Sequence, residues 1–420
     1  MKHFSPWEYL CIDVANNHHS GLDKQRFEDR IDWVLQNITT LEDEAKGEER
    51  WKERPLYIKA VAALRKAQRG EPTGHLVGFD AICSGMQIMS ALTGCREGAR
   101  ATGLVDPDRR ADAYQQCSDL MSQKLGVKLP DNKKKVKNAV MTSLYGSKKE
   151  PQKEFGKDTP ELQAFYESMM EICPGPVELL QALLDSWNPY STYHHWVLPD
   201  GFNAVVKVMQ PDEHRIEVEE LDRASFTYMF YENKGKKKDV KNAANVIHSI
   251  DAYVLRSLVR RCNYDPEAFR NAFNWITDTL LMRELNNCEP CFDSGQLSEK
   301  VCEYWDLYID SGIADIVAIP QLTTADIEIL PSRYLKALQR TLNKVLCSAP
   351  FEVVTIHDDF RCHPNNMDVL RQHYNDILAE LSAGTVLDFI LTQLYKYPLQ
   401  WDKSDPDLWK TIQNANYALC

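Results

Sequence analysis

The sequence predicts a helix-rich α+β fold built from two or three packed subdomains. Stretches with helical periodicity fill most of the chain, and strand-like segments are confined to a few short regions. The length of 420 residues also exceeds what a single compact core usually contains. With 44% hydrophobic and 26% charged residues, the composition is that of an ordinary globular protein.

The composition disfavours several protein classes. No run of about eighteen apolar residues occurs, so a membrane span is not expected, and the first residues lack the apolar core of a signal peptide. Twelve cysteines are scattered without a framework, which favours reduced thiols and a cytoplasmic location. Cys288 and Cys291 have CxxC spacing, but no second ligand pair accompanies them, so zinc binding or redox chemistry there is not favoured.

Residues 1–78 are expected to have mixed structure. Helices are predicted near 26–46 and 56–68, and a short apolar strand at 75–80 follows them. Small residues then begin a helix at 83, and helical patterns dominate 107–188.

The second half begins with a β-rich passage over 193–232, in which turn residues separate strand-like segments. A long helix is predicted at 242–261, whereas residues 262–330 are expected to be irregular and helical, without a readable motif. The segment 351–364 predicts a strand, a tight acidic tip and a second strand, and helical stretches close the chain.

A lysine-rich segment, KKKVKNAVMTSLYGSKKE, runs from 133 to 150 in a chain whose net charge is −12. In a helix, residues four apart share one side, so Lys133, Lys137, Met141 and Tyr145 are predicted to line one stripe. Gly146 follows where a helix can stop or bend. Taken alone, the segment is more typical of a solvated basic helix end.

Three acidic residues lie at the ends of apolar strand-like segments. Asp80 ends the first of these segments, and Asp358 and Asp359 form the tip of the last one. Acids in such places are costly unless they meet cations, and Mg²⁺ prefers carboxylates together with substrate phosphates as ligands. Two such ions about 4 Å apart can clamp the attacking and leaving oxygens of a phosphoryl transfer. Acids and lysines together therefore indicate nucleotidyl transfer with two Mg²⁺ ions.

These segments resemble the motifs of the single-subunit RNA polymerases of bacteriophages and mitochondria. GFDAICSGMQIMSAL (78–92) is similar to motif A of that family, the lysine-rich segment to motif B, and TIHDDF (355–360) to motif C. HHWVLPDGF, NVIHSIDAYVL, GLDKQRFEDRI and the final IQNANYALC also resemble segments of the family. The resemblance covers roughly 5–256 and 345–420, and it implies the palm and fingers of a right-hand polymerase.

For the reaction itself, the resemblance implies a two-metal site. Asp80 and Asp358 would hold both Mg²⁺ ions, with the backbone carbonyl of Ala81 as a further ligand. Lys137 would bind the triphosphate of the incoming nucleotide and protonate the departing pyrophosphate. Lys133 stands where the family has an arginine that binds the phosphates. The lysine keeps the positive charge but lacks the planar guanidinium that binds a phosphate through two hydrogen bonds.

For the nucleotide and the template, the resemblance implies three further roles. Tyr145 would stack near the incoming base and help to select ribose, and Gly146 would let the helix approach the template. His248 would contact the growing RNA end and the nucleotide site. A core histidine with satisfied hydrogen bonds is the alternative interpretation of His248.

Two positions bear on the choice between RNA and DNA synthesis. Family A DNA polymerases carry a glutamate five residues after the motif A aspartate, where it blocks a 2′-hydroxyl; Gly85 occupies that position here and leaves room. Asp359 is a serine in many phage RNA polymerases and is acidic in DNA polymerases. Gly85 and Tyr145 together favour RNA synthesis, with Asp359 as a secondary acid near the substrate.

The resemblance also implies a division into subdomains. Residues 1–96 would form the N-terminal part of the palm with motif A, and 97–248 the fingers with the motif B helix and a hairpin region. Residues 249–420 would form the C-terminal part of the palm with motif C, interrupted by an insertion at about 262–330. The passage 203–240 occupies the place of the family's promoter-specificity hairpin, although its sequence is not recognisable. The thumb and the N-terminal domain of the family are not recognised.

The expected function is DNA-directed RNA synthesis, with DNA template, RNA product and ribonucleoside triphosphates as partners. An Asp-x-x-Gly-Arg element of the family is not found, and a second polypeptide is expected to supply it together with the thumb and the N-terminal region. Some podoviruses use such a two-polypeptide RNA polymerase, and this chain resembles its catalytic subunit, which acts in the host cytoplasm. A family A-like DNA polymerase or primase, and a non-catalytic nucleic-acid-binding subunit, stay open as alternatives.

Overall fold

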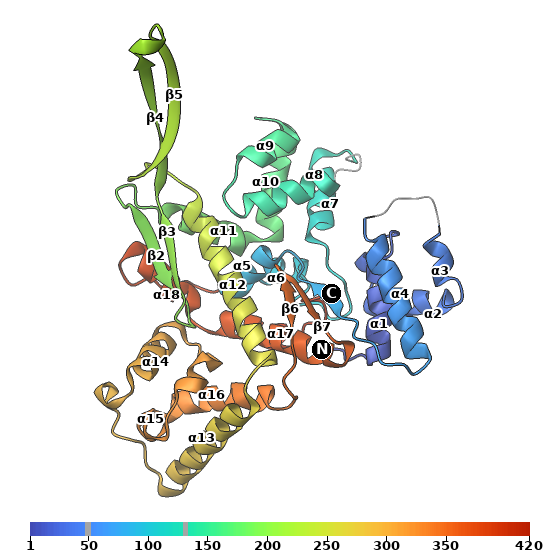
Figure 1. Ribbon diagram of the computed structural model, residues 1–420, viewed down its shortest axis with the longest axis vertical. Helices are drawn as coiled ribbons and strands as arrows, with labels where there is room; N and C mark the ends of the chain where they lie inside the picture. Colours follow the sequence, from blue (N-terminus) through green and yellow to red (C-terminus); the bar gives the residue numbers. More distant parts are fainter. Residues whose placement is uncertain (47–51, 129–132) are drawn as a thin grey trace.

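A computed structural model describes residues 1–46, 52–128 and 133–420 of the chain. The helix-rich α+β class is confirmed: helices surround one small antiparallel sheet, and two further hairpins lie to one side of it (Figure 1). The main hydrophobic core runs from the N-terminal helices through the sheet to the last residues of the chain.

The central sheet has the strand order β1-β7-β6 and is antiparallel throughout. Its alternating pattern separates two faces, because successive side chains of a strand point to opposite sides. Val77, Phe79, Phe360 and Cys362 are buried on one face, which packs into the core. The other face carries polar side chains. The strands are β1 (Val77–Asp80), β6 (Val354–Ile356) and β7 (Asp359–Cys362).

The N-terminal helices form a separate group beside the sheet, drawn in blue in Figure 1. The first of them begins with a capping box, in which the Ser5 hydroxyl accepts from the Glu8 N–H and the Glu8 carboxylate accepts from the Ser5 N–H. The predicted helices near 26–46 and 56–68 are confirmed. The elements are α1 (Pro6–Asn16), η1 (Leu22–Lys24), α2 (Phe27–Gln36), α3 (Leu41–Glu44) and α4 (Arg54–Gln68).

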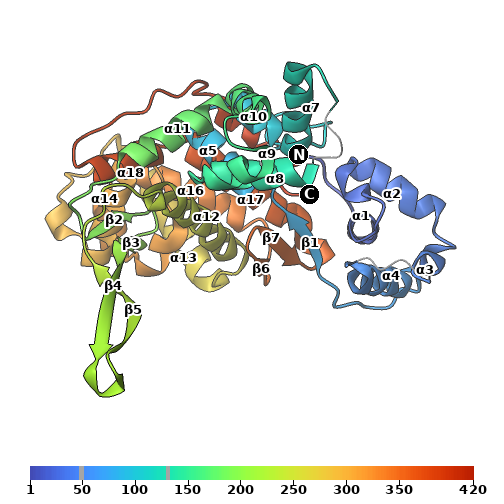
Figure 2. The ribbon, with the colours of Figure 1, turned by 90° about the horizontal axis from the view of Figure 1, so that it is seen from above.

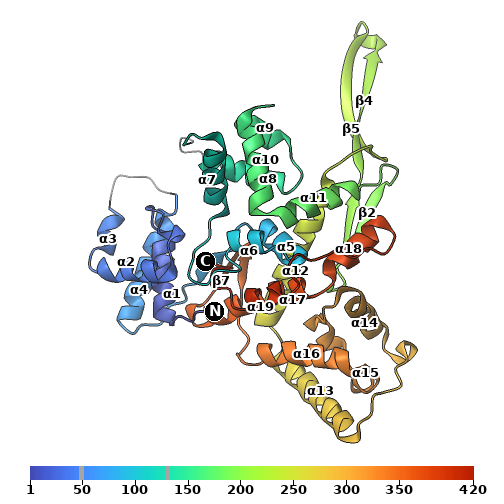
Figure 3. The same cartoon turned by 180° about the vertical axis from the view of Figure 1, so that it is seen from behind.

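Helices fill the chain from the end of the first strand of the sheet to residue 185, as predicted. Those drawn in teal lie above the sheet, with the N-terminal group to their left (Figure 3). The elements are α5 (Ser84–Thr93), α6 (Arg96–Ala101), α7 (Ala113–Leu125), α8 (Lys133–Ser143), α9 (Lys149–Phe155), α10 (Pro160–Ile172) and α11 (Pro174–Asp185).

Two hairpins and a long helix follow. The second hairpin stands out from the body, and the view from above shows the same projection (Figure 2). It carries several exposed large apolar side chains, among them Phe226, Tyr228 and Tyr231. The elements are β2 (Tyr193–Val197), β3 (Asn203–Lys207), β4 (Met209–Val218), η2 (Glu219–Leu221), β5 (Ala224–Asn233) and α12 (Lys241–Cys262).

Residues 262–330 are helical, as expected, with loops and short 3-10 helices between the α-helices. These residues and the helix after them build a second hydrophobic core, around Ile276, Trp305, Tyr334 and Leu338. The sequence did not predict this core, because it joins apolar residues that are distant in sequence. The elements are α13 (Pro266–Asn286), η3 (Ser294–Gln296), α14 (Glu299–Ser311), η4 (Ile316–Gln321), α15 (Thr324–Ile329) and α16 (Ser332–Val345).

The chain closes with η5 (Pro364–Asn366), α17 (Met367–Ala383), α18 (Val386–Tyr395) and α19 (Leu408–Ile412). Among the described residues, no single helix is long and apolar enough to cross a membrane. A bent pair, Pro364–Ala383 with Val386–Tyr395, passes that test by length and composition alone. Both termini lie beside the central sheet (Figure 1).

Candidate functional site

A cleft of about 830 Å³ lies over the polar face of the central sheet. Its walls come from the N-terminal helices, the start of α5, the loop before α7, one side of α8, and the turn between β6 and β7. Segments more than 300 residues apart in sequence therefore meet in one cavity. The predicted site residues that line it are Asp80, Ala81, Gly85, Lys133, Lys137, Tyr145, Asp358 and Asp359.

The acidic tip predicted from the sequence is a two-residue turn between β6 and β7. Ile356 pairs with Asp359, so His357 and Asp358 form the turn, and His357 adopts a left-handed φ of 56°. The Ala81 N–H donates a hydrogen bond of 3.0 Å to the Asp358 carbonyl oxygen. Since Asp80 pairs directly with Asp359, the backbone brings all three carboxylates to one edge of the sheet.

The environment of Asp80 is electrostatically unfavourable for a charged carboxylate. Burial by the cleft walls, followed by the nearby Asp359 and Asp358, raises the pKa of Asp80 from 3.8 to about 6, although its side chain still reaches solvent. Within the described part of the chain, the carboxylates of Asp80 and Asp358 have no ion pair or hydrogen bond with a side chain. A cluster of unpaired acids with oxygen donors fits a site for hard divalent cations.

A second group of potential metal ligands includes His18 and His19, which also line the cleft. The ligand atoms of His18, His19 and Glu44 fall within 4.8 Å of one another. His18 is buried and its Nε2 lies 3.5 Å from a Glu44 carboxylate oxygen. The chemistry predicted from the sequence concerns the acids at the sheet edge and not this group.

The predicted stripe of α8 is confirmed. Lys133, Lys137, Met141 and Tyr145 all line the cleft, whereas Lys134 and Lys135 are exposed outside it. Lys133, Lys137 and Met141 share this side because every fourth residue of a helix returns to nearly the same side, and Tyr145 lies in the turn that follows Ser143.

The two lysines of the stripe have different environments. Lys133 forms an ion pair of 2.8 Å with Asp112, whose other oxygen caps α7 by accepting from the Gln115 N–H. Burial opposes ionisation of Asp112, but the bonds from Lys133 and Gln115 leave its pKa below the ordinary value. The Lys137 ammonium lies 5.6 Å from the centre of the Tyr114 ring, and its side chain is exposed in the cleft. Lys137 is therefore the freer cation for an anionic substrate.

Gly85 and Tyr145 are in direct contact, although sixty residues separate them in sequence. A Cβ atom at position 85 would lie 2.8 Å from the Tyr145 hydroxyl oxygen, which is closer than side chains tolerate. The Tyr145 ring also packs on His248, with 4.6 Å between ring centres. Burial, with Cys83, Asp251 and Asp358 nearby, raises the pKa of Tyr145 to about 12, so the hydroxyl stays protonated and able to donate.

Gly146 is required by its backbone and its neighbours. Its φ of 87° lies in the left-handed region, and a Cβ atom there would meet Leu184 at 3.1 Å and Val240 at 3.2 Å. These contacts lie within the protein. The approach to a template therefore stays a prediction, and the structure supplies a separate reason for glycine.

His248 lies on α12, beside the cleft residues and exposed to solvent. Burial of part of the ring, with His357 nearby, lowers its pKa. It is not a core histidine, which removes the alternative interpretation. The segment HHWVLPDGF holds this helix: the buried Trp196 indole donates to Ser249 at 2.9 Å, and Asp200 pairs with Arg256 and Arg260 at 2.7 and 3.0 Å.

The last residues of the chain form part of the site. The Cys420 N–H donates to the Asp80 carbonyl oxygen at 3.0 Å, and Ala81 pairs with Leu419 as an isolated bridge. Tyr417 stacks on Phe27 and its hydroxyl accepts from the Phe27 N–H. The tail thus adds a short strand-like contact beside β1 and supports the acidic edge.

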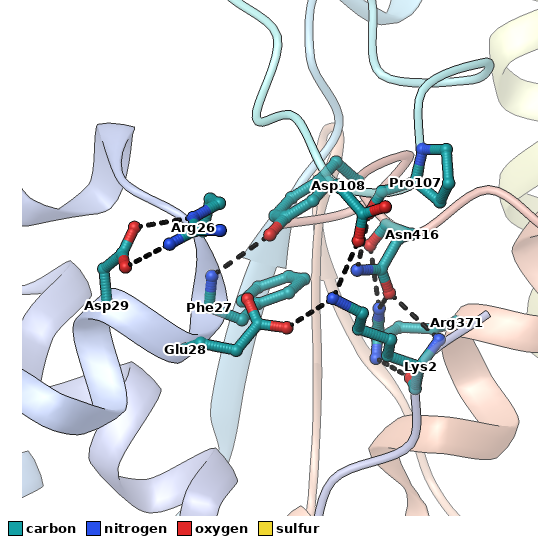
Figure 4. Close-up of polar contacts among 10 residues, drawn as sticks. Lys2, Arg26, Phe27, Glu28, Asp29, Pro107, Asp108, Arg371 and Asn416 are labelled. Carbon is teal, nitrogen blue, oxygen red and sulfur yellow. Dashed lines mark hydrogen bonds and ion pairs between the residues drawn. The ribbon is translucent and has the colours of Figure 1, made fainter.

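Arg371 connects the tail to the N-terminus (Figure 4). Its buried guanidinium donates to the Asn416 carbonyl oxygen at 2.8 Å and to the Lys2 carbonyl oxygen at 3.1 Å. It also donates to the Tyr9 hydroxyl at 2.7 Å.

Arg371→Met is expected to lower the free energy of unfolding by about 3–5 kcal/mol in urea denaturation, because buried partners lose their donor. The exposed Lys2→Met is the matched control and should change it by less than about 1 kcal/mol. Equal effects of both substitutions would contradict this account.

The sequence did not single out several residues that the fold brings to the cleft. Lys24, Tyr114 and Arg361 line it, and Asp251 lies near Asp358, where burial first and then that acid raise its pKa to about 6. No local signal marked them. Asp251 stands one turn after His248 on the same helix, which is the one regularity that pointed toward it.

Comparison with known sequences indicates which family the chain resembles. Residues 4–161 match the family model of DNA-dependent RNA polymerases. This region contains Asp80, Gly85, Lys133, Lys137 and Tyr145. The resemblance to phage and organellar RNA polymerases is therefore confirmed.

Two of the individual relatives are DNA-directed RNA polymerases. The chain is 30% identical to the mitochondrial DNA-directed RNA polymerase 1 of Arabidopsis thaliana over 169 residues, which cover 33% of this chain and 17% of that protein. It is 26% identical to the DNA-directed RNA polymerase of Pseudomonas phage phiKMV over 303 residues, covering 58% of this chain and 36% of the phage protein. The matched parts thus span well under half the length of these relatives.

Proposed function

We propose that this chain is the catalytic part of a DNA-directed RNA polymerase that adds ribonucleotides to an RNA 3′ end on a DNA template. One observation carries the proposal. Unpaired acids at a sheet edge, an exposed lysine on a neighbouring helix, and a tyrosine packed over a glycine all face one cleft within a polymerase-like chain. Each part corresponds to one need of nucleotidyl transfer.

Divalent cations are part of the proposal. Asp80 and Asp358, with the backbone carbonyl of Ala81, would hold two Mg²⁺ ions, which supply charge neutralisation and lower the pKa of an attacking hydroxyl. Burial first, and then the nearby Asp359 and Asp358, raise the pKa of Asp80, and a bound cation would stabilise its charged form.

The chain's own side chains bind and orient the nucleotide. Lys137 would contact the triphosphate and donate a proton to the departing pyrophosphate, and Lys133 would add positive charge if it exchanged Asp112 for a phosphate. Tyr145 would present its hydroxyl toward the sugar, with His248 holding the ring. Gly85 would leave the space that a 2′-hydroxyl needs.

The arrangement of the larger parts is proposed on the same basis. Residues 1–96 and 249–420 would act as the palm and 97–248 as the fingers, with Gly146 near the template. Asp359 would lie close to the substrate without being one of the metal-binding pair. The second polypeptide, the promoter reading by the 203–240 hairpin and the cytoplasmic location stay predictions.

The direct test is extension of an RNA primer on a DNA template by the purified chain, with and without its co-expressed genomic neighbours. Ribonucleotide incorporation that depends on Mg²⁺ is expected. Incorporation of deoxynucleotides alone would favour the DNA polymerase alternative. Template binding without any incorporation, under every combination, would favour the non-catalytic alternative.

Tyr145→Phe tests the sugar-selecting role. Loss of the hydroxyl is expected to leave ribonucleotide incorporation within about tenfold of the original, while the preference for ribose over deoxyribose falls by about tenfold or more, because one hydrogen bond is lost. Single-nucleotide extension with each nucleotide type measures both quantities. Tyr114→Phe, which removes another cleft hydroxyl, is the control and should keep the preference. An unchanged preference in Tyr145→Phe would count against the role.

A further inference from the structure

The inference concerns Asp359, the third carboxylate at the sheet edge. It follows Asp358 directly and stands opposite Asp80 in the strand register. Three carboxylates at one edge repel each other, and a third would also compete for the cations that the other two hold. The position of the Asp359 side chain therefore determines how strongly its charge repels Asp80 and Asp358 and competes with them for cations.

Arg361 contacts Asp359 on the same face of the same strand. Residues two apart on a strand share a face, so the guanidinium lies next to the carboxylate. Its Nε and Nη2 donate to the same Asp359 oxygen, Oδ2, at 2.8 and 2.5 Å. The other oxygen, Oδ1, is buried and has no hydrogen-bond partner in the described structure.

Gly78 lies beside the Asp359–Arg361 pair, and its missing side chain leaves room for the pair. It stands opposite Arg361 in the register, and a Cβ atom there would lie 2.8 Å from Asp359 Oδ1 and 3.0 Å from Arg361 Cγ. Gly78 precedes Asp80 by two residues on β1, which is about 7 Å along a strand. The Asp359 carboxylate is thus directed toward the beginning of β1, away from the end that carries Asp80.

We propose that Arg361 and Gly78 form a positioning device that holds Asp359 away from Asp80 and Asp358 and compensates its charge, so that Asp359 is not a metal ligand. The proposal rests on the proposed function, because it concerns the same acidic edge. It explains how the chain tolerates an acid at this position. According to the proposal, the chain tolerates Asp359 because Arg361 compensates its charge and Gly78, on the neighbouring strand, leaves room for the pair.

The consequence is an asymmetry between the two partners. Removing the Asp359 charge leaves an arginine that can reach the solvent of the cleft, since Arg361 is half-buried. Removing the arginine leaves a partly buried carboxylate unpaired beside two others, which is the costlier change. If Asp359 were a metal ligand, removing Asp359 would instead be the costlier change.

The experiment uses the full chain and four variants: Asp359→Asn, Arg361→Gln, the double variant, and Gly78→Ala. Mn²⁺, which binds similar oxygen ligands, is titrated by electron paramagnetic resonance, and single-nucleotide extension gives kcat and KM separately. Asp359→Asn should change Mn²⁺ affinity by less than about threefold, whereas Arg361→Gln should tighten it about tenfold and lower kcat about tenfold. The double variant should restore both, and Gly78→Ala should resemble Arg361→Gln.

The control is Arg65→Gln, which breaks a comparable two-point pair with Glu42 outside the cleft and should change neither quantity. A tenfold loss of Mn²⁺ affinity in Asp359→Asn, not restored in the double variant, would make Asp359 a ligand and overturn the proposal. So would an Arg361→Gln variant with unchanged Mn²⁺ affinity. If the original chain shows no extension at all, the proposed function fails, while the Mn²⁺ titration still decides the role of the pair.

Discussion

Asp80→Asn and Asp358→Asn are each expected to reduce RNA extension by roughly a thousandfold or more, because each removes one charged ligand from the proposed two-metal site. Template binding, measured by fluorescence anisotropy with labelled DNA, should stay within about threefold of the original chain, since neither carboxylate supplies positive charge. Asp388→Asn, on α18 away from the cleft, is the matched control and should keep its activity. Extension retained in either site variant would remove the metal assignment.

The same substitution at Asp80 has a stability consequence that distinguishes lost chemistry from lost folding. A folded-state pKa of about 6, above the ordinary 3.8, means that the folded chain keeps a proton that the unfolded chain has already released. The free energy of unfolding of the metal-free protein should therefore fall as pH rises from about 4 to about 6. Asp80→Asn should lack this component and be at least as stable as the original chain above pH 6. Thermal unfolding at several pH values, without metal, measures the difference.

Lys137→Met is expected to lower kcat/KM for ribonucleotides by about a hundredfold, because the exposed ammonium is the proposed contact and proton donor for the triphosphate. Methionine keeps the length of the side chain and its helix propensity, so the effect reports the charge. Steady-state extension with varied nucleotide concentration separates kcat from KM.

Lys134→Met is the matched control for Lys137→Met. It removes the same charge from the same helix, three residues away, at a position outside the cleft. Activity within about twofold of the original is expected for it, since a solvated charge outside the site is screened. If both variants lose activity equally, α8 contributes general positive charge and Lys137 has no special role.

The part of the site that could be predicted lies in short segments with strong periodicity. The α8 stripe follows from a repeat of 3.6 residues, and the tip at Asp358 follows from two apolar runs around a turn. Such patterns are encoded by neighbouring residues, so they are readable without knowledge of the fold. The same holds for α12, a long helix that the local sequence predicts.

Other features could not be predicted, because they depend on pairs of residues distant in sequence. The ion pair between Lys133 and Asp112 occupies the lysine that was expected to be open for phosphates. The second core around Trp305 made regular helices of a region without a local motif. Arg371 ties the tail to the N-terminus through buried polar groups that are far apart along the chain.

From its amino-acid order alone, the chain is predicted to be a helix-rich α+β protein with the acids, lysines and tyrosine of the proposed nucleotidyl-transfer site, since local spacing and residue chemistry are covalent properties. Tertiary packing determined which of these residues contact one another. It placed the Tyr145 hydroxyl against Gly85, set the final residues beside Asp80, and turned Asp359 toward Arg361 over Gly78. Most of these contacts join segments that are distant in sequence, and the packing of the buried core determines which of them meet.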